Sequence, residues 1–354
     1  MYFAVIDCGT TNSRIYILDR EKRVVSKIFE NFGVRDVAVH GSKEILKENL
    51  HKAFLRVARE GKVNGRKIKF AVASGVITSE IGLVELSHLK APVTIDELAE
   101  GVRKIKDKSV FPLDIPVFFI RGVKTLLLPQ RKDLKSAGKS DFMRGEETQT
   151  VGFLSAYKAE LPVILVFLTS HTKYVAVDEK RKIKGSITTL SGQVYEAVVS
   201  KTVIGKSVKG KEEFEDSTYF DSSVIDYALS CVEKSGLLRT LLLTRIADVL
   251  LETDLRERKF FLEAAIAAED IKALGQFEEF GFPQKAEFVI IGENKRRSKI
   301  YEYLFKKMKP DLFLKKIDDR ESIERLTVNG SIEIIKRYFF RNPQEKELAG
   351  FSFD

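Results

Sequence analysis

The sequence predicts an α/β protein built from two related halves, and two observations lead to this prediction. Residues 2–6 (YFAVI) are an apolar run that ends at Asp7, a polar Gly/Thr/Asn turn follows, and a second apolar run (IYIL) occupies 15–18, which is the pattern of a β-hairpin. Apolar runs around a polar turn at 169–173 open the second half in the same way. We therefore expect a duplicated α/β domain with a cleft between the two copies.

The remaining elements of the first half follow from periodicity. A third strand is expected at about 23–30, and 67–73 and 115–121 are predicted to be buried strands. The segment 43–61, between the strands at 23–30 and 67–73, has helical spacing, and Gly61 is a suitable residue to end this helix. The apolar residues that share one face of this helix are Leu46, Leu50, Ala53, Phe54 and Val57. The order β-β-β-α-β-α-β predicts a mixed sheet rather than a simple Rossmann repeat.

The second half continues the α/β pattern. It is expected to contain three strands within 161–192, a helical stretch from about 217 to 280, a strand ending at Gly292, a helix over 295–308, a strand near 311–317 and a last helix through Ile335. Residues 131–141 (RKDLKSAGKSD) are expected to be a solvated loop. We place the two domains at 1–155 and 156–354.

Composition describes a soluble globular protein. The chain has 354 residues, 44% of them hydrophobic, and a net charge of +9 in which Lys, Arg and Glu are closely mixed, so nucleic-acid binding is disfavoured. Cys8 and Cys231 lie far apart and form neither a disulfide framework nor a CxxC metal site. No basic n-region precedes the first strand, and no run approaches the ~20 apolar residues of a membrane span. We expect a cytoplasmic protein without membrane contact and leave open an oligomer of identical chains.

The turn DCGTTNSR, 7–14, predicts a phosphate site. Gly9 allows close backbone approach, the amides and hydroxyls of Thr10, Thr11 and Asn12 can surround an anionic oxygen, and Asp7 at the strand end can hold hydrated Mg²⁺. The alternative is an ordinary polar hairpin turn, which often contains these residue types.

These residues resemble the first phosphate-binding hairpin of the actin/hexokinase/Hsp70 superfamily. Within it, the segment DFMRGEETQTVG at 141–152 resembles the 2-dehydro-3-deoxygalactonokinase family, which carries a nearly identical MRGEETQ block. Further blocks match in the same order, namely DCGTTNSR, SGVITSEIG (74–82), SHTKYV (170–175), TLSG (189–192) and AAIAAEDIKAL (264–274). The resemblance implies two RNase H-like (actin-like ATPase) domains, ATP and Mg²⁺ as cofactors, and a sugar acid as substrate.

The block at 141–152 supplies the residue types that phosphoryl transfer needs. A hydroxyl that attacks the γ-phosphate needs a carboxylate to accept its proton, and related sugar kinases place an acidic residue after a glycine at a helix start, so Glu146 is the expected base. Asp141 is the second candidate, with N-cap of the helix as its other role. Arg144 is assigned to the sugar-acid carboxylate and Glu147 to a hydroxyl. The alternative is an ordinary helix start, in which Asp141 caps the helix and Glu146 and Glu147 interact favourably with the positive end of the helix dipole.

Two further blocks are assigned by the resemblance. Ser74, Gly75, Thr78 and Ser79 follow a buried strand and are expected near the sugar, although a polar loop is the alternative. The second hairpin carries Ser170, His171 and Lys173 as expected phosphate contacts. The family pattern there is close to P-G-T-H-S-K, and this chain has Thr169 in place of the glycine, where a Cβ can block a phosphate.

The nucleotide is expected at Gly192, in TLSG, and at Gly292 and Glu293, where a strand–glycine–helix arrangement matches the adenosine site of the superfamily. This chain departs from the family there, with Glu-Asn-Lys-Arg-Arg (293–297) in place of small polar residues.

The predicted function is transfer of the ATP γ-phosphate to 2-dehydro-3-deoxy-D-galactonate, giving the 6-phosphate. Two alternatives remain. One is a regulatory protein of the same fold that binds ATP or a sugar acid with little or no kinase activity. The other is a kinase for another small acid or polyol, since Arg144 favours an anionic acceptor without specifying it.

Overall fold

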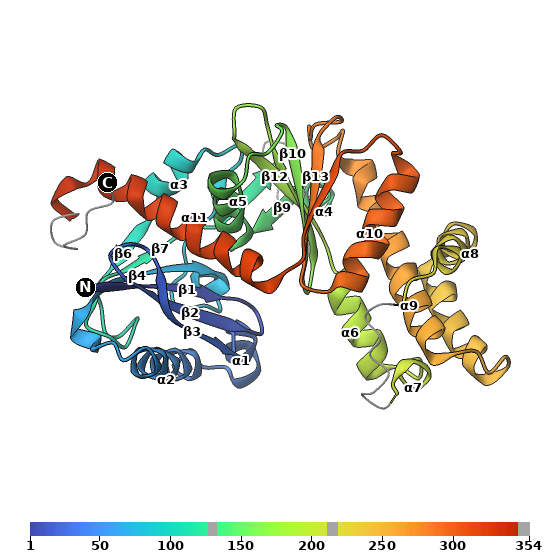
Figure 1. The fold of residues 1–354 in the computed structure, drawn as a ribbon, viewed down its shortest axis with the longest axis horizontal. Coiled ribbons are helices and arrows are strands. Elements are labelled where there is room, and N and C mark those ends of the chain that lie inside the picture. The colour runs from blue at the N-terminus through green and yellow to red at the C-terminus, as the bar shows by residue number, and fades with distance from the viewer. Residues whose placement is uncertain (127–132, 211–218, 346–354) are drawn as a thin grey trace. The chain divides into compact units, whose positions relative to one another are not determined.

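The computed structural model describes residues 1–126, 133–210 and 219–345 (Figure 1). The chain divides into two compact units. The first contains 1–159, 180–185 and the segment from Glu324 onward, and the second contains 160–179 and 186–323. A division of the sequence at 155/156 would give the last helix to the second half, whereas most of that helix groups with the first unit.

A six-stranded mixed sheet organises the first unit. Its strands are β1 (Tyr2–Cys8), β2 (Ser13–Leu18), β3 (Val24–Glu30), β4 (Ile68–Gly75), β6 (Arg103–Ile105) and β7 (Val117–Phe119). The order is β3-β2-β1-β4-β7-β6; β1, β4 and β7 run parallel, and β2, β3 and β6 pair antiparallel. The predicted hairpin, third strand and mixed sheet are confirmed.

Helices α1 (Val34–His40) and α2 (Glu44–Glu60) pack on this sheet. The face of α2 predicted from its 3.6-residue period is the buried face, since Leu46, Leu50 and Val57 are fully buried against strand residues such as Ile6 and Ile15. This apolar layer fixes β1, and therefore the end of β1 where Asp7 lies.

A second, three-stranded sheet completes the strands of the first unit. It has the order β5-β8-β9, with β5 (Leu89–Lys90), β8 (Val123–Leu126) and β9 (Ser140–Met143), and α3 (Ile95–Gly101) and α4 (Leu134–Ala137) are nearby in sequence. The expected loop at 131–141 is therefore wrong for most of its length, because it contains α4 and the start of β9. Its residues 131–132 lie outside the described residues. A short 3-10 helix, Gly65–Lys67, precedes β4.

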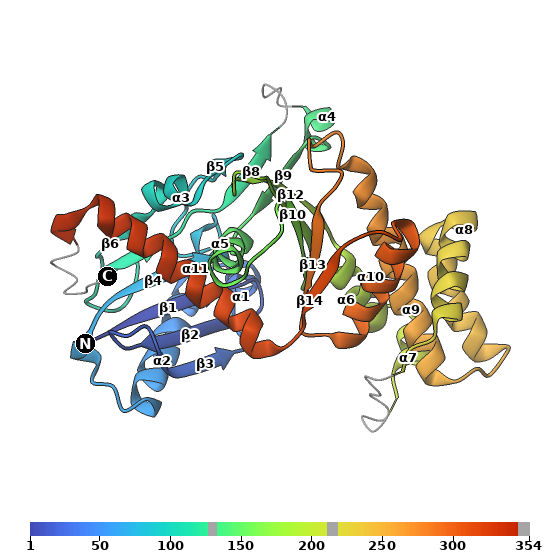
Figure 2. The same ribbon diagram turned by 45° about the horizontal axis from the view of Figure 1, so that its top comes forward.

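Two helices of the first unit cross in close backbone contact. They are α5 (Glu146–Ala156) and α11 (Arg320–Arg341), which lie side by side in both ribbon views (Figure 2). A Cβ at Gly152 of α5 would collide with the carbonyl oxygen of Leu326, and one at Gly330 of α11 would collide with that of Thr148. Only glycines at both positions permit this crossing.

The second unit repeats the sheet of the first. Its five strands, β10 (Val163–Leu168), β11 (Thr172–Val177), β12 (Ile183–Thr189), β13 (Glu287–Ile291) and β14 (Leu314–Ile317), have the order β12-β11-β10-β13-β14. As in the first unit, the chain forms a hairpin, continues through helices and then returns as a strand, β13, that pairs in parallel with the first strand of the hairpin, β10. The predicted duplication is confirmed at the level of sheet topology.

The helices of the second unit are α6 (Ser191–Lys201), α7 (Gly205–Val208), α8 (Ser222–Val249), α9 (Leu255–Asp270) and α10 (Lys295–Met308), with a 3-10 helix at Ile271–Gln276. The helical stretch expected at 217–280 is thus two helices and a short 3-10 segment, and its residues 217–218 lie outside the described residues. Helix α8 has a kink at Gly236, where φ is +76°.

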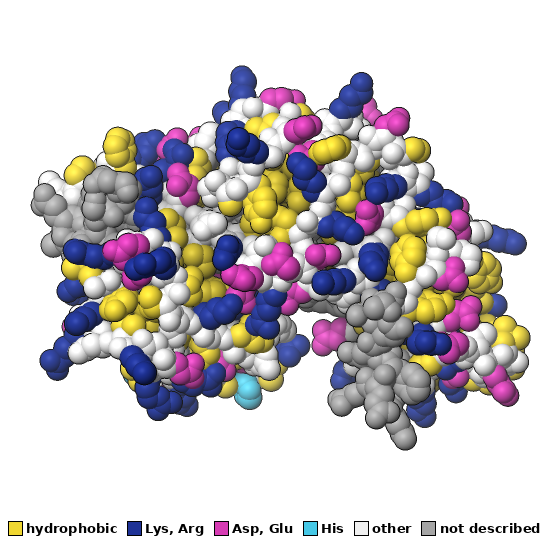
Figure 3. All heavy atoms as spheres, viewed as in Figure 1, with side chains coloured by type: hydrophobic (Ala, Val, Ile, Leu, Met, Phe, Trp, Pro, Cys, Tyr) yellow, Lys and Arg dark blue, Asp and Glu magenta, His cyan; other side chains and the backbone are white. Residues whose placement is uncertain are grey.

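The surface mixes charges of both signs. On the face that Figure 3 shows, Lys and Arg side chains are interspersed with Asp and Glu. Among the described residues, none of the helices combines the length and the apolar character that crossing a membrane requires.

Candidate active site

Asp7 lies at the end of β1, beside the end of β4. The parallel register pairs Asp7 with Ser74 and Cys8 with Gly75. Gly75 has φ +91°, and a Cβ there would collide with the Cys8 carbonyl oxygen and lie 3.3 Å from Oδ1 of Asp7. Glycine is therefore required for β4 to end this close to the Asp7 carboxylate.

The turn after β1 is fixed by α1. The Gly9 amide donates to the Asn12 carbonyl at 2.9 Å, which closes the turn. The amides of Val34 and Arg35, at the start of α1, donate to the carbonyls of Gly9 and Thr10. These bonds hold the predicted phosphate loop in one shape, as a preorganised anion site requires.

Helix α5 begins against the end of β4. Its N-cap, Gly145, has φ +111°, and a Cβ there would lie 3.5 Å from the Cα of Gly75. Glu146 is the first residue of the helix. It is close enough to Asp7 for its negative charge to raise the pKa of Asp7. The structure therefore brings together Asp7, Gly75 and Glu146, which lie up to 139 positions apart in the chain.

The protonation of Asp7 is set by opposing influences. Burial is the largest and raises its pKa, Arg14 at 3.4 Å lowers it, and Glu146 raises it, so that the net shift is upward. Two carboxyl groups this close favour a bound cation, because a cation relieves both burial and mutual repulsion.

Glu147 supports the turn before α5. Its side chain is fully buried, and both carboxylate oxygens accept from the Gly145 amide, at 2.9 and 2.8 Å. Burial raises its pKa to about 7, against the lowering effect of those bonds. Its contacts are those of a group that fixes the conformation of Gly145.

Arg144 joins the helix start to the loop after β4. Its guanidinium donates to Thr78 Oγ1 at 2.7 Å and to the Leu86 carbonyl at 2.8 Å, and contacts His88 Nδ1 at 3.5 Å. Burial lowers the pKa of Arg144, while Glu147, Glu80 and Glu85 raise it. Arg144 therefore contacts Thr78, in the segment 74–79 that the sequence analysis places near the sugar.

The polar residues of the segment 74–79 differ in whether they have hydrogen-bond partners. Val76–Thr78 form a 3-10 helix, in which the Thr78 hydroxyl donates to the Gly75 carbonyl and the Ser79 hydroxyl to that of Val76. Ser74 Oγ, next to Asp7 in the sheet register, is buried and has no hydrogen-bond partner among the described residues. A buried hydroxyl without a partner indicates a place for a ligand or water.

Asp141 lies apart from this group. It belongs to β9, where it pairs with Thr125 of β8, and its Oδ1 accepts from the Phe142 amide at 2.6 Å. The expected role as N-cap of the helix is wrong, because Gly145 is the N-cap and β9 continues to Met143.

In the second unit, the predicted phosphate turn contacts the predicted nucleotide residue Gly192. A Cβ at Gly192 would lie 2.7 Å from the Ser170 carbonyl oxygen, and the adjacent Gln193 amide donates to that carbonyl at 2.9 Å. Ser170 is exposed and lies 3.1 Å from His171 Nδ1, whereas Lys173 is almost fully buried within β11. The blocks at 170–175 and 189–192 thus form one local structure.

Gly292 follows β13 beside β10. A Cβ on this residue would lie 2.9 Å from the Cβ of Leu168, so the glycine permits β13 to end next to the turn at 169–171. Glu293 is exposed, one residue before the α10 N-cap, Asn294.

Arg297 of α10, which the sequence reasoning did not assign, connects these segments. It donates to the Thr169 carbonyl at 2.6 Å, to Thr172 Oγ1 at 2.9 Å and to Ser191 Oγ at 2.8 Å. Below it, the Tyr301 and Thr189 hydroxyls donate to the carboxylate of Asp270, which is almost fully buried. The only signal in the sequence was a positive charge shortly after Gly292, in the segment that departs from the family.

A known protein family matches most of this chain. The family model described as 2-keto-3-deoxy-galactonokinase matches residues 7–319. A curated protein of Rhizobium meliloti (strain 1021), named probable 2-dehydro-3-deoxygalactonokinase, is 22% identical over 202 residues, which are 57% of this chain and 58% of that protein. The alignment therefore spans less than two thirds of this relative.

Solved structures show the same fold. A protein from Sinorhizobium meliloti, named as a candidate 2-dehydro-3-deoxygalactonokinase, has a TM-score of 0.69 at 17% identity and covers 95% of this chain and 98% of its own. The activator of the 2-hydroxyisocaproyl-CoA dehydratase from Clostridium difficile, with bound ADPNP, has a TM-score of 0.52 at 12% identity and covers 98% of both chains. The predicted fold of two α/β domains is confirmed.

The family model matches from Asp7, at the end of β1, to Asp319, just before α11, and therefore covers most of the chain. The chain belongs to the 2-keto-3-deoxy-galactonokinase family.

Proposed function

We propose that this chain is an ATP-dependent kinase that phosphorylates 2-dehydro-3-deoxy-D-galactonate to its 6-phosphate. The observation that carries this proposal is the position of Glu146. It begins α5 within electrostatic reach of Asp7, where a base and a cation-binding carboxylate would be needed together. Family membership and the fold support the same activity.

Glu146 is the proposed base. The sugar hydroxyl oxygen forms a bond to the γ-phosphorus, the bond from that phosphorus to the bridging oxygen of ADP breaks, and the hydroxyl proton passes to the Glu146 carboxylate. Asp141 remains the second candidate, although its place in β9 is less favourable than the helix start.

Asp7 is the proposed metal ligand. Among the described residues there is no cluster of three or more His, Cys, Asp or Glu side chains that could hold a metal ion. Proteins bind Mg²⁺ through one or two carboxylates, water and substrate phosphates, so Asp7 and the ATP phosphates would suffice as ligands. Asp7, which is partly exposed and within electrostatic reach of Glu146, fits such an ion, which would neutralise phosphate charge during transfer.

The first unit would hold the sugar acid and the second unit the nucleotide. Arg144 has five N–H donors, of which the contacts to Thr78, Leu86 and His88 use three, so donors remain for a sugar-acid carboxylate. The unpartnered Ser74 hydroxyl is suited to a sugar oxygen. For the phosphates we propose Gly9–Asn12, Ser170, His171 and Lys173, and for the nucleotide Gly192, Gly292 and Glu293.

A coupled ADP-release assay with Mg-ATP and a panel of 2-keto-3-deoxy sugar acids tests this proposal. Turnover that requires the acid, and that falls by about 10²–10⁴-fold in Glu146→Gln, would support the kinase and its base. Asp141→Asn is the matched variant and is expected to retain turnover. The opposite ranking of the two variants would move the base to Asp141.

The regulatory alternative is favoured by one observation. Thr169 occupies the second phosphate turn in place of the family glycine, and its side chain is exposed there. ATP binding measured by calorimetry, without turnover on any acid, would support a binding protein. Turnover confined to a different acid or polyol would support the other alternative.

A further inference from the structure

The second half of α8 has an exposed face that is apolar. Thr240, Leu241 and Thr244 are buried toward the rest of the helical layer. On the exposed side, Leu238 is 85% exposed, Leu242 42% and Val249 54%. The spacing i, i+4, i+11 places these three in one row along the helix. A surface helix normally carries polar residues on its outer face, so an apolar outer face indicates a partner there.

Two more exposed leucines follow the end of the helix. Leu250 and Leu251, in the turn toward α9, are 72% and 68% exposed. We call Leu238, Leu242, Val249, Leu250 and Leu251 the outer stripe. Single exposed apolar residues are ordinary on protein surfaces, but five exposed apolar side chains this close together in the chain are of the kind found at interaction surfaces.

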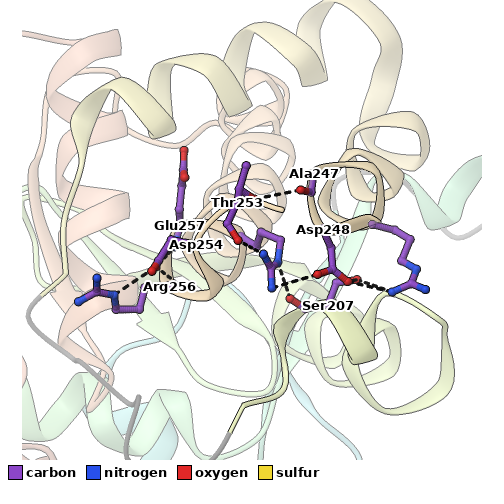
Figure 4. Close-up of polar contacts among 9 residues, drawn as sticks. Ser207, Ala247, Asp248, Thr253, Asp254, Arg256 and Glu257 are labelled. Carbon is purple, nitrogen blue, oxygen red and sulfur yellow. Dashed lines mark hydrogen bonds and ion pairs between the residues drawn. The ribbon is translucent and has the colours of Figure 1, made fainter. Parts of the chain in front are cut away.

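The charged residue within the outer stripe is neutralised from inside the unit. Arg245 has the i+7 position of the row, and it donates to Ser207 Oγ and to Asp248 Oδ2, the latter at 2.9 Å. Arg258 pairs with the other oxygen of Asp248 at 3.2 Å and donates to the Ser207 carbonyl. Figure 4 shows this cluster, which joins α7, α8 and α9. These contacts hold α8 in place before a partner binds, so binding at the outer stripe needs less ordering of the chain.

Exposed charges of opposite sign flank the outer stripe. Lys234 and Arg239 lie toward its beginning and Glu252 at its end, and none of the three has an ion-pair partner among the described residues. Glu233, also near the beginning, acts on Lys307 of α10 instead. One end of the stripe is thus positive and the other negative.

We propose that the outer stripe is the contact surface for a second copy of this chain, with the two α8 helices antiparallel about a two-fold axis. In that arrangement the leucines of the two stripes face each other over about 16 Å of helix. Arg239 then lies near Glu252 of the partner subunit, and the same contact occurs twice because a two-fold interface is self-complementary. A parallel arrangement would instead bring like charges together.

Sedimentation velocity of the full chain over about 1–100 µM tests the proposal. The wild type is expected to sediment as a dimer, and Leu238→Glu/Leu242→Glu as a monomer with an unchanged circular dichroism spectrum. Leu134→Glu is the matched control, because Leu134 is 89% exposed on α4 of the first unit and should leave the dimer intact. A wild-type monomer throughout this range would overturn the proposal.

Charge reversal tests the antiparallel arrangement itself. Arg239→Glu and Glu252→Arg are each expected to weaken the dimer by about tenfold or more in Kd, and the double variant to restore it, since each pair is re-formed with its signs exchanged. Single and double variants that dimerise like the wild type, or a double variant weaker than both singles, would refute the pairing of Arg239 with Glu252.

Discussion

Replacing Arg297 by Met tests whether the second phosphate turn depends on this side chain. Methionine has a comparable length but cannot donate, so the three hydrogen bonds to Thr169, Thr172 and Ser191 are lost. If the turn binds ATP phosphates, its loss of order should reduce ATP affinity as well as stability.

The expected cost in stability is smaller than three hydrogen bonds. The Thr172 and Ser191 hydroxyls remain bonded to each other at 2.7 Å, and Thr172 also contacts the Tyr301 hydroxyl. The Thr169 carbonyl belongs to an exposed residue, where water can replace Arg297. We therefore expect a loss of about 2 kcal/mol in the free energy of unfolding, near that of one charged hydrogen bond.

The effect on ATP affinity follows from the order of the turn. Fixing the backbone of one residue costs about 1–2 kcal/mol, which corresponds to about tenfold in Kd if binding must order one additional residue. Isothermal titration calorimetry with Mg-ATP measures this change, and urea unfolding measures the stability.

Arg296→Met is the matched control. Arg296 is the preceding residue on α10, and it pairs with Glu263 at 2.6 Å, with both side chains nearly buried, so its loss should reduce stability by about 3 kcal/mol without affecting the turn. Wild-type ATP affinity in Arg297→Met, or an equal loss of affinity in both variants, would refute the reasoning.

Two further predictions concern the first unit. Gly152→Ala should destabilise the chain by about 3 kcal/mol or more, because the new methyl group collides with the Leu326 carbonyl. Gly65→Ala is the control and should change stability little, because a methyl group there meets open space. Equal urea midpoints for the two variants would contradict the close crossing. Burial raises the pKa of Glu147 from an ordinary 4.5 to about 7, so the folded state binds more protons than the unfolded state between these values. Stability should therefore fall by about 3 kcal/mol as pH rises from 4.5 through 7, and Glu147→Gln should flatten this slope in unfolding curves at pH 5 and 8; a wild type that gains stability over that range would contradict it.

The fold was largely predictable because its signals are local. The apolar run before Asp7 indicates a strand buried on both faces, the 3.6-residue period of 44–60 indicates a helix buried on one face, and both elements formed as expected. The segment 131–141 was misread because charged residues are as common on exposed helices and edge strands as in loops. Here Asp133 caps α4, and β9 pairs with β8 only through tertiary structure.

The site was less predictable, since its contacts join distant segments. The role of Glu147 depends on its complete burial, and a sequence pattern cannot distinguish a buried carboxylate that fixes a turn from an exposed one that meets a ligand. Arg297 was missed for a similar reason. Its three acceptors lie 106 to 128 positions away in the chain, so its importance appears only once β10, α6 and α10 are packed.

The glycine contacts between α5 and α11 have a mechanical consequence. Because backbone touches backbone at Gly152 and Gly330, neither helix can slide or rotate over the other at this crossing without a collision. Glu146, the proposed base, is the first residue of α5, so a displacement of α11 would move α5 and Glu146 with it. A spectroscopic label on the exposed Phe340 position of α11 would therefore report movements of Glu146 about 200 residues earlier in the chain.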